Sequence, residues 1–333
     1  MYSDKDIAIV ILNWNGKTLL EQFLPSILKY SEDAKIYVAD NASTDSSVEF
    51  LKTSFPEVTI IQNSENGGYA KGYNEALQHV SEPLLCLLNS DIEVTKNWLD
   101  GILTAFNSEA KPDILQPKIL DYKDKSKFEY AGAAGGFIDR YGYPFCRGRI
   151  FDTIEDDKGQ YNDVIDIFWA SGACFFIKNE IFKSLKGFDE SYFAHMEEID
   201  LCWRAYNSNY KTQYVGTSTV YHVGGATLEN TNPKKTYLNF RNSLMTLVKN
   251  TDSNVLSKAV TRMLLDGVAG IRFLLQLKPS HFIAIIKAHV SFYLNLRNIL
   301  KERKTLKKCP NYYQTSSIVW TYYVKKTKRF NCL

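Results

Sequence analysis

The first 115 residues alternate between short apolar runs and longer stretches with helical spacing. Ile7–Leu12 is a continuous β-rich apolar run, whereas Thr18–Lys29 repeats its apolar positions as an amphipathic helix does. Further strands are expected at Ile36–Ala39, Val58–Gln62 and Leu84–Leu88, and further helices at Ser46–Phe55, Gly72–Val80 and Asn97–Asn107. This alternation predicts an α/β fold with a mostly parallel sheet flanked by helices.

The pattern changes between residues 116 and 235, where short β-like pieces are separated by long loops rich in Gly and Asp. Strands are expected at Ile114–Ile119, Ile165–Trp169, Cys174–Ile177 and Thr212–Tyr221, with one clear helix at Glu197–Asn207. Long loops inside a compact domain commonly carry function. We therefore expect residues 1–235 to form one domain whose second half shapes a pocket.

Residues 236–333 have helical spacing throughout, over Tyr237–Val248, Val255–Leu277 and Phe282–Leu300. They carry 17 Lys and Arg against 3 Asp and Glu, whereas residues 1–235 carry 23 against 34, so the formal net charge of +3 hides an uneven distribution. Charged residues interrupt each apolar run well short of the ~20 residues that a membrane span needs. The pattern predicts a basic amphipathic helical extension that contacts an anionic membrane surface; the alternative is a helical cap with a solvated basic face.

The cysteines and the first residues indicate a cytoplasmic protein. The six cysteines include no CxxC pair and lie mostly in apolar segments, which is typical of reduced, buried thiols. Asp4 and Asp6 precede the first strand, where a secretory leader would have a basic front. We expect a cytoplasmic location, with peripheral contact at the inner face of the cell membrane.

Three of the expected strands end in polar clusters. Asn13 and Asn15 follow the first strand, Asp40 begins the cluster after the second, and Asn89-Ser90-Asp91 follows the strand Leu84–Leu88. The carboxyl ends of parallel strands share one edge of a sheet, which is where α/β proteins bind nucleotides. These clusters predict a nucleotide crevice, in which Asp40 contacts the base or ribose and Asp45 caps the next helix.

The third cluster also predicts a metal site. Oxygen ligands from Asp91 and Asn89 suit Mg²⁺ or Mn²⁺ held against a diphosphate. His222, at the end of the strand Thr212–Tyr221 and before Gly224-Gly225, can complete a metal or diphosphate site.

Two further segments have candidate chemistry. Asn66, Gly68 and Lys71 surround a paired glycine turn before a helix, where free amides and an ammonium could meet phosphate; a tight turn is the simpler interpretation. Glu197, Glu198 and Asp200 bring three carboxylates into the start of one helix. A desolvated carboxylate with a raised pKa can act as a general base, although acidic residues are also favoured at a helix N-terminus by the dipole.

Taken together, these residues make the chain resemble family 2 glycosyltransferases of the GT-A fold, especially bacterial rhamnosyltransferase-like members, from residue 7 to about residue 250. The segments that carry the resemblance are Ile11–Gly16, Ala39–Asp45, Asn66–Asn74, Leu88–Asp91, Ser171–Ala173, Gly187–Glu190, Glu197–Arg204 and His222–Gly225.

The resemblance implies an inverting transfer of rhamnose or another hexose from a nucleotide-diphospho-sugar to a hydroxyl of a glycan or polyprenyl-diphosphate-linked acceptor in surface polysaccharide synthesis. Residues 1–115 would be the nucleotide-binding half and residues 116–235 the acceptor half. The nucleotide would contact Asn13, Asn15, Asp40, Asn66, Gly68, Lys71, Asn89 and Ser90, and Trp169, Ser171, Gly172 and Ala173 would line the donor and acceptor pocket. Mn²⁺ or Mg²⁺ would lie at Asp91, Asn89 and His222.

The resemblance places the general base at Glu198, where the family usually has Asp. The extra methylene shifts the carboxylate, so Glu197 and Asp200 stay as competing candidates. Asn89 likewise replaces the first Asp of the family's metal motif. Two alternatives stay open: a nucleotidyltransferase with the same crevice, and a lapsed enzyme that only binds nucleotide or glycan. No aromatic-basic motif indicates nucleic-acid binding.

Overall fold

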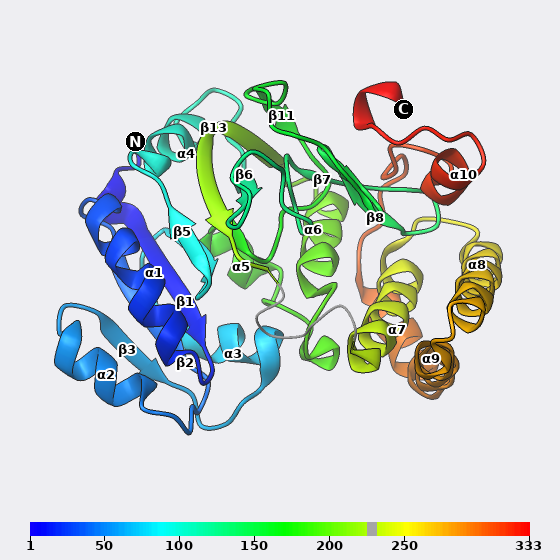
Figure 1. Ribbon diagram of the computed structural model, residues 1–333, viewed down its shortest axis with the longest axis horizontal. Coiled ribbons are helices and arrows are strands. Elements are labelled where there is room, and N and C mark those ends of the chain that lie inside the picture. The colour runs from blue at the N-terminus through cyan, green and yellow to red at the C-terminus, as the bar shows by residue number, and fades with distance from the viewer. Residues whose placement is uncertain (225–231) are drawn as a thin grey trace.

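The computed structural model describes residues 1–224 and 232–333, and it is built around a central sheet of nine strands (Figure 1). The strand order is β11-β13-β6-β12-β4-β1-β2-β3, with β5 paired to β13. The strands are β1 (Ile7–Asn13), β2 (Lys35–Asp40), β3 (Thr59–Gln62), β4 (Leu84–Asn89), β5 (Ile92–Val94), β6 (Ile114–Asp121), β11 (Val164–Asp166), β12 (Cys174–Lys178) and β13 (Thr212–His222).

The parallel half of the sheet aligns the predicted polar strand ends. Strands β3, β2, β1 and β4 are mutually parallel, and β13 is parallel to β6, whereas β12 is antiparallel to both of its neighbours. The register pairs Asn13 with Asp40 and Leu12 with Asn89. The predicted mostly parallel sheet is confirmed, and the three polar clusters leave it at one edge.

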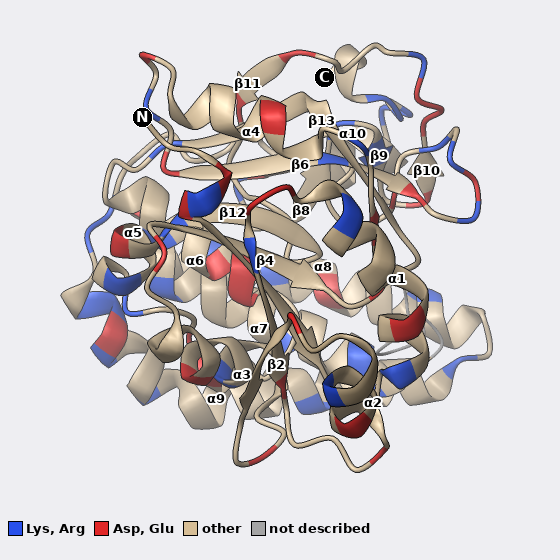
Figure 2. Cartoon of the chain, turned by 90° about the vertical axis from the view of Figure 1, so that its left-hand side faces the viewer, with Lys and Arg blue, Asp and Glu red and all other residues tan. Residues whose placement is uncertain are grey.

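Helices cover both faces of this sheet. They are α1 (Lys17–Tyr30), α2 (Ser47–Ser54), α3 (Gly68–Ala76), α4 (Trp98–Phe106), α5 (Asn179–Ser184) and α6 (Glu197–Asn207). Alternate residues of β1 enter different core clusters, Ile9 on one face and Val10 on the other, so the strand is apolar throughout. The central strands are accordingly mostly tan in Figure 2, where charged residues lie on helices and loops.

Two local expectations differ from the structure. Helix α3 begins at Gly68 and not at Gly72, because the glycine turn itself forms its first residues. The loop-rich segment contains a second, antiparallel sheet of short strands that lack any long apolar run. These are β7 (Gly136–Ile138), β8 (Pro144–Cys146), β9 (Arg149–Ile150) and β10 (Thr153–Ile154). Short 3₁₀ turns occur at Asp4–Asp6, Leu77–His79, Glu190–Tyr192 and Phe330–Cys332.

The C-terminal segment is helical, as expected, and packs on the α/β part of the chain (Figure 1). Its helices are α7 (Pro233–Asn250), α8 (Val255–Leu275), α9 (Pro279–Thr305) and α10 (Ile318–Tyr323). Leu244 and Leu247 of α7 belong to the same core cluster as Trp203 of α6. Within the described residues, no helix combines the length and the apolar character that crossing a membrane requires.

A buried ion-pair network fixes α6 to α7. The carboxylate of Asp200 is fully buried and contacts Nε of Arg204 at 2.8 Å and Nζ of Lys249 at 2.9 Å. Nδ2 of Asn250 donates to the same carboxylate over 2.7 Å. Burial opposes the charge on Asp200, but Lys249 and Arg204 together hold its pKa below the ordinary value. The carboxylate therefore stays ionised and joins the two helices.

We predict that Asp200→Asn destabilises the protein by about 3 kcal/mol, because buried Arg204 loses its counter-charge and Lys249 keeps only Asp189, at 2.6 Å, and the half-exposed Glu302. Urea unfolding followed by circular dichroism measures this change. The matched control is Asp33→Asn in the exposed pair with Lys5, which should cost less than about 0.5 kcal/mol. Equal effects of the two substitutions would contradict the anchoring role of Asp200.

Candidate active site

The ends of β1 and β2 bring two residues that are predicted to bind the nucleotide into direct contact. Nδ2 of Asn13 donates to Oδ1 of Asp40 over 3.1 Å, and both side chains are buried. The other carboxylate oxygen of Asp40 accepts from the backbone amide of Ser43 at 3.0 Å. Asp40 is thereby held at the strand end with its charge stabilised by two donors.

The side chain of Asn15 holds the neighbouring loop. Its Oδ1 accepts from the backbone amides of Thr44 at 2.7 Å and Asp45 at 3.2 Å. The N-cap of α2 is Ser46, one residue after the predicted Asp45, although the Asp45 side chain does accept from the amide of Ser47 at 3.0 Å. The backbone amide of Asn15 also donates to the Ser43 hydroxyl at 2.9 Å, so these contacts give Asn15 a loop-positioning role.

The glycine turn docks against the loop that precedes α6. Oδ1 of Asn66 accepts from the amide of Gly68 at 3.0 Å, and the amide of Tyr69 donates to the carbonyl of Phe193 at 2.8 Å. Gly68 has a left-handed φ of 73°, and a Cβ there would collide with the Phe193 carbonyl. The turn therefore requires glycine, and it connects the nucleotide half to the loop that carries the acidic cluster.

Lys71 lies apart from this contact. Its ammonium pairs with Glu65 and lies 3.6 Å from Glu75 on the same helix. The geometry argues against the predicted phosphate contact, because both carboxylates already neutralise the charge.

At the end of β4, Asp91 and His222 form the centre of the predicted metal site. Nε2 of His222 lies 3.2 Å from Oδ1 of Asp91 and 3.4 Å from Nδ2 of Asn89. Nδ1 of the same ring lies 3.4 Å from Oε1 of Glu129. Strands β4 and β13 bring these residues together from positions more than 130 apart in sequence.

The electrostatics of this group favour positive charge. Burial opposes a charged His222, but the two carboxylates raise its pKa to about 10. Burial also opposes the charge of Asp91, yet the hydrogen bond from His222 lowers its pKa. A carboxylate oxygen and an imidazole nitrogen that face each other fit a divalent cation that takes the place of the imidazolium proton, with phosphate oxygens as further ligands. In the described residues, no group of three or more His, Cys, Asp and Glu side chains is arranged to hold a metal ion.

Glu129 is a site residue that sequence reasoning missed. It is buried, accepts from the backbone amide of Ala131, and orients the far side of the His222 ring. It follows a short irregular stretch, so no strand-end pattern marks it. Gly224 has a left-handed φ of 69°, and a Cβ there would lie 3.0 Å from Oε1 of Glu129. Gly225, the second glycine of that motif, lies outside the described residues.

The loop Ser171–Ala173 connects this site to the acidic cluster. The carbonyl of Ala173 accepts from the amide of Asn89 at 2.9 Å. At the preceding residue, a Cβ on Gly172 would lie 3.7 Å from the carboxyl carbon of Glu198, and the hydroxyl of Tyr69 donates to the Gly172 carbonyl at 2.8 Å. One short loop therefore adjoins both the end of β4 and the start of α6.

Ser171 and Trp169 have structural contacts within this region. The Ser171 hydroxyl donates to the carbonyl of Ala131 at 2.5 Å, and Nε1 of the buried Trp169 donates to the carbonyl of Phe137 at 2.8 Å. Trp169 packs over Gly136 of the second sheet. The Trp169 side chain is therefore packed against the second sheet, which argues against direct contact with a sugar.

Glu197 and Glu198 begin α6 beside the Gly172 loop. Burial raises the pKa of Glu198 to about 7, and it raises the pKa of Glu197 further, with a contribution from the neighbouring Glu198 charge. Oε2 of each carboxyl group has no hydrogen-bond partner among the described residues. A carboxyl group with an unused oxygen and a pKa near neutrality can take a proton from a bound hydroxyl.

Asp200, the third acidic candidate, lies on a different face of α6 from Glu198. Its carboxylate is occupied by Arg204, Lys249 and Asn250, and its pKa is lowered, so it is poorly suited to act as a base. The helical period explains the difference, because residues two apart on a helix lie on different faces.

The loop before α6 is strained and is held by α7. Phe193, His195 and Met196 all have left-handed φ values, between 63° and 76°. Nδ2 of Asn242 approaches the carbonyls of Tyr192, Ala194 and His195 at 2.7–3.1 Å. Asn242 is a positioning residue that sequence reasoning missed, since it lies in an ordinary helical pattern.

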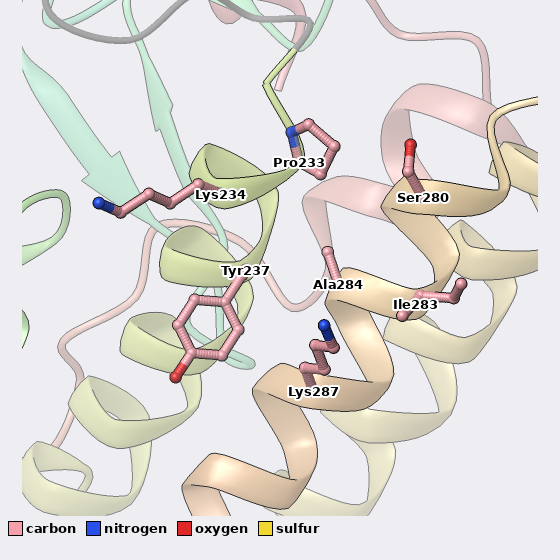
Figure 3. A pocket seen from close by; sticks show the side chains of 7 residues that line it. All are labelled: Pro233, Lys234, Tyr237, Ser280, Ile283, Ala284 and Lys287. Atoms are coloured by element: carbon pink, nitrogen blue, oxygen red, sulfur yellow. The ribbon is translucent and has the colours of Figure 1, made fainter.

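A separate hollow of about 500 Å³ lies between α7 and α9 (Figure 3). In Figure 3, Lys287 points into the space between the two helices, whereas Lys234 points away from it. The ammonium of Lys234 lies 5.2 Å from the ring centre of Phe193, in the loop before α6. The first turn of α7 therefore lines the hollow and also contacts the loop before α6.

The mostly parallel sheet, with its polar strand ends at one edge, has the GT-A glycosyltransferase fold. Solved structures with this fold include GalNAc-T7 with UDP, GalNAc and Mn²⁺ (TM-score 0.58, 15% identity, covering 96% of this chain and 56% of that one). Another is the mannosyltransferase PcManGT from Pyrobaculum calidifontis in complex with GDP-Man and Mn²⁺ (TM-score 0.54, 12% identity, covering 87% of each chain).

Residues 8–185 match the family described as glycosyl transferase family 2, so the chain belongs to that family and is a glycosyltransferase. The N-acetylglucosaminyl-diphospho-decaprenol L-rhamnosyltransferase of Mycobacterium tuberculosis is 25% identical over 233 residues, which cover 65% of this chain and 75% of that protein. The low-salt glycan biosynthesis hexosyltransferase Agl10 of Haloferax volcanii is 23% identical over 287 residues, covering 82% and 86%. The family resemblance inferred from the motifs is confirmed.

We predict that Glu198→Gln raises the melting temperature by roughly 3 °C at about pH 8.5 and leaves it unchanged at about pH 4. Unfolding lets Glu198 ionise near its ordinary pKa of 4.5, whereas the folded protein keeps the proton until about pH 7. The stability from this group is therefore complete at low pH and is lost as the pH rises through about 7. Thermal unfolding at both pH values measures the effect, with the exposed Glu57→Gln as control; a stabilisation that is equal at both pH values would contradict the assigned burial.

Proposed function

We propose that this glycosyltransferase inverts the anomeric configuration while it moves rhamnose or another hexose from a nucleotide-diphospho-sugar to a hydroxyl of a lipid-linked glycan. The name of the mycobacterial relative describes a rhamnosyl transfer onto a diphospho-decaprenol-linked sugar. The observation that carries the proposal is the position of Glu198, whose Oε2 has no hydrogen-bond partner among the described residues and which lies beside Gly172, next in the chain to Ala173, the residue bonded to Asn89. A candidate base and a candidate diphosphate site that adjoin neighbouring residues of one short loop suit a single displacement.

In the proposed reaction, Glu198 removes the proton from the acceptor hydroxyl as this oxygen attacks the anomeric carbon. The bond to the diphosphate breaks on the opposite face, and the nucleoside diphosphate leaves with the electron pair. A single displacement inverts the configuration. Glu197, whose pKa is also raised by burial and by the neighbouring Glu198 charge, stays a second candidate beside it.

The strand ends supply the nucleotide side of the site. Asp40, positioned by Asn13, contacts the base or ribose, and the backbone at Gly68, Asn89 and Ser90 borders the diphosphate. Asp91 and His222 would hold Mn²⁺ or Mg²⁺ with Asn89 beside them. When bound, the cation would neutralise charge that develops on the leaving diphosphate.

The acceptor places the enzyme at a membrane surface. The C-terminal segment has 17 basic and 3 acidic residues. Its net positive charge complements anionic lipid headgroups. We propose a cytoplasmic protein in peripheral contact with the inner face of the cell membrane, where a polyprenyl-diphosphate-linked glycan would present its hydroxyl.

The deciding experiment is a panel of nucleotide-sugars with lipid extract as acceptor, scored for released nucleoside diphosphate with and without Mn²⁺. We predict release from a subset of donors, lost by about 1,000-fold in Glu198→Gln while nucleotide affinity changes less than about threefold. Activity should rise with pH through about 7, because the base must be ionised.

Asp200→Asn serves as the contrast: Asp200 positions α6 but exchanges no proton, so activity per folded molecule should fall by no more than about tenfold. A fully active Glu198→Gln enzyme would refute the base assignment. Release of pyrophosphate in place of a nucleoside diphosphate would instead identify a nucleotidyltransferase.

A second prediction concerns the metal. Asp91→Asn should weaken the Mn²⁺-dependent part of UDP, GDP or dTDP binding by about tenfold or more, with little change in metal-free binding. Calorimetric titration of each nucleotide with and without Mn²⁺ tests this without any turnover. Glu93→Gln, on the neighbouring strand and outside the cluster, is the control; equal losses in both variants would remove Asp91 from the metal site.

A further inference from the structure

Helices α8 and α9 expose an apolar surface that the α/β part of the protein leaves uncovered. In the described part of the chain, 25 large hydrophobic side chains are exposed, and 14 of them lie between Leu256 and Leu300. We call the outward-facing apolar residues of α8 and α9 the apolar ridge. Its main members are Leu256, Val260, Leu264 and Val268 on α8 and Ile286, Val290 and Leu294 on α9, each 47–80% exposed.

The ridge follows from helix geometry. Its residues recur every four positions, so each set forms one stripe along its helix. The opposite face of α8 is buried through Ala259, Arg262 and Asp266, and that of α9 through Ala288 and Phe292. Each helix therefore has an inner face that packs on the protein and an outer face that is also apolar, where a soluble helix is normally polar.

The borders of the ridge are aromatic and basic. Arg272 of α8 donates to the hydroxyl of Tyr323 at 2.7 Å, which places α10 beside the end of α8, and Trp320 of α10 is 57% exposed. The outward side of α9 becomes basic beyond the ridge, at Arg297, Lys301 and Lys304. A further run of exposed cations follows α10, at Lys325, Lys326, Lys328 and Arg329.

We propose that the apolar ridge inserts into the headgroup region of an anionic bilayer, with α8 and α9 lying along the membrane surface. Apolar side chains at the centre, Trp and Tyr at the border and cations around them match the layers of a bilayer interface. Neither helix qualifies as a membrane span in the described residues, which favours this interfacial position. The inference rests on the membrane contact proposed above, and it replaces a purely electrostatic contact with apolar insertion.

Charge argues against a second copy of the chain as the occupant. Residues 236–333 contain three acidic residues, Asp252, Asp266 and Glu302. Asp266 is buried against Arg262, and Asp252 pairs with Lys258 at 2.8 Å. A symmetric dimer through the ridge would bring the basic borders of two copies together with few carboxylates to offset them, whereas anionic lipid supplies the complementary charge.

The position of the ridge also connects it to the site. Ile283 and Lys287 of α9 line the hollow between α7 and α9 in Figure 3, on the turns that also carry the ridge residue Ile286. The other wall begins at Pro233 and Lys234, next to Phe193 in the loop before α6. A bilayer in contact with the ridge would therefore lie near the acceptor side of the active site.

The test is flotation of the full chain with vesicles of phosphatidylcholine and phosphatidylglycerol, at low salt and at about 1 M NaCl. Wild type should bind, and a substantial fraction should stay bound at high salt, because apolar insertion is not screened. Leu264→Glu/Val268→Glu should reduce the partition coefficient by about 100-fold. The control Ile154→Glu/Val164→Glu adds the same charge at exposed apolar positions outside the helices and should stay within about threefold of wild type.

Each alternative outcome is distinct. Equal binding by the two variants, or complete release of wild type by salt, would overturn insertion of the ridge. A dimer in vesicle-free solution that the ridge variant alone dissociates, without vesicle binding, would identify the ridge as a self-interface. Glu198→Gln should float like wild type, and the ridge variant should keep wild-type nucleotide affinity, so failure of the chemistry and failure of docking are separable.

Discussion

The carboxylate of Asp200 is the contact on which the arrangement of the active site depends. It is fully buried and its charge is offset by Arg204 of its own helix and Lys249 of α7. The same helix, α6, presents Glu198 from its first turn on another face. Because a buried carboxylate without partners would be strongly unfavourable, the ion pairs fix α6 against α7 and so fix the direction of Glu198.

The C-terminal helices therefore help to position the active site, beyond the membrane contact proposed for them. Asn242 of α7 holds the carbonyls of a strained loop whose Phe193 contacts the glycine turn of α3. The glycine turn of α3, the loop before α6 and α7 are joined by a series of short polar contacts. Movement of α7 relative to the sheet would shift both the glycine turn and the start of α6, which connects the proposed membrane contact of α8 and α9 physically to the site.

The two chemical centres of the site differ in their electrostatics. Around His222, two carboxylates favour positive charge, which suits a cation and a diphosphate. Around Glu198, burial and a neighbouring acid disfavour negative charge, so that this carboxyl group exchanges a proton near neutral pH. The loop Ser171–Ala173 separates and connects these environments, so one substrate can reach both.

The sequence alone determined the parallel sheet, the polar ends of β1, β2 and β4, and the family, because strand periodicity and strand-end residues are local signals. It also identified Glu197, Glu198, Asp91 and His222 as candidates. Only the tertiary structure separated Glu198 from Asp200, paired Lys71 with Glu65, and added Glu129 and Asn242, since each depends on partners distant in the chain. The apolar ridge has the same origin: helical spacing predicted amphipathic helices, but which of their faces is buried depends on what packs against them.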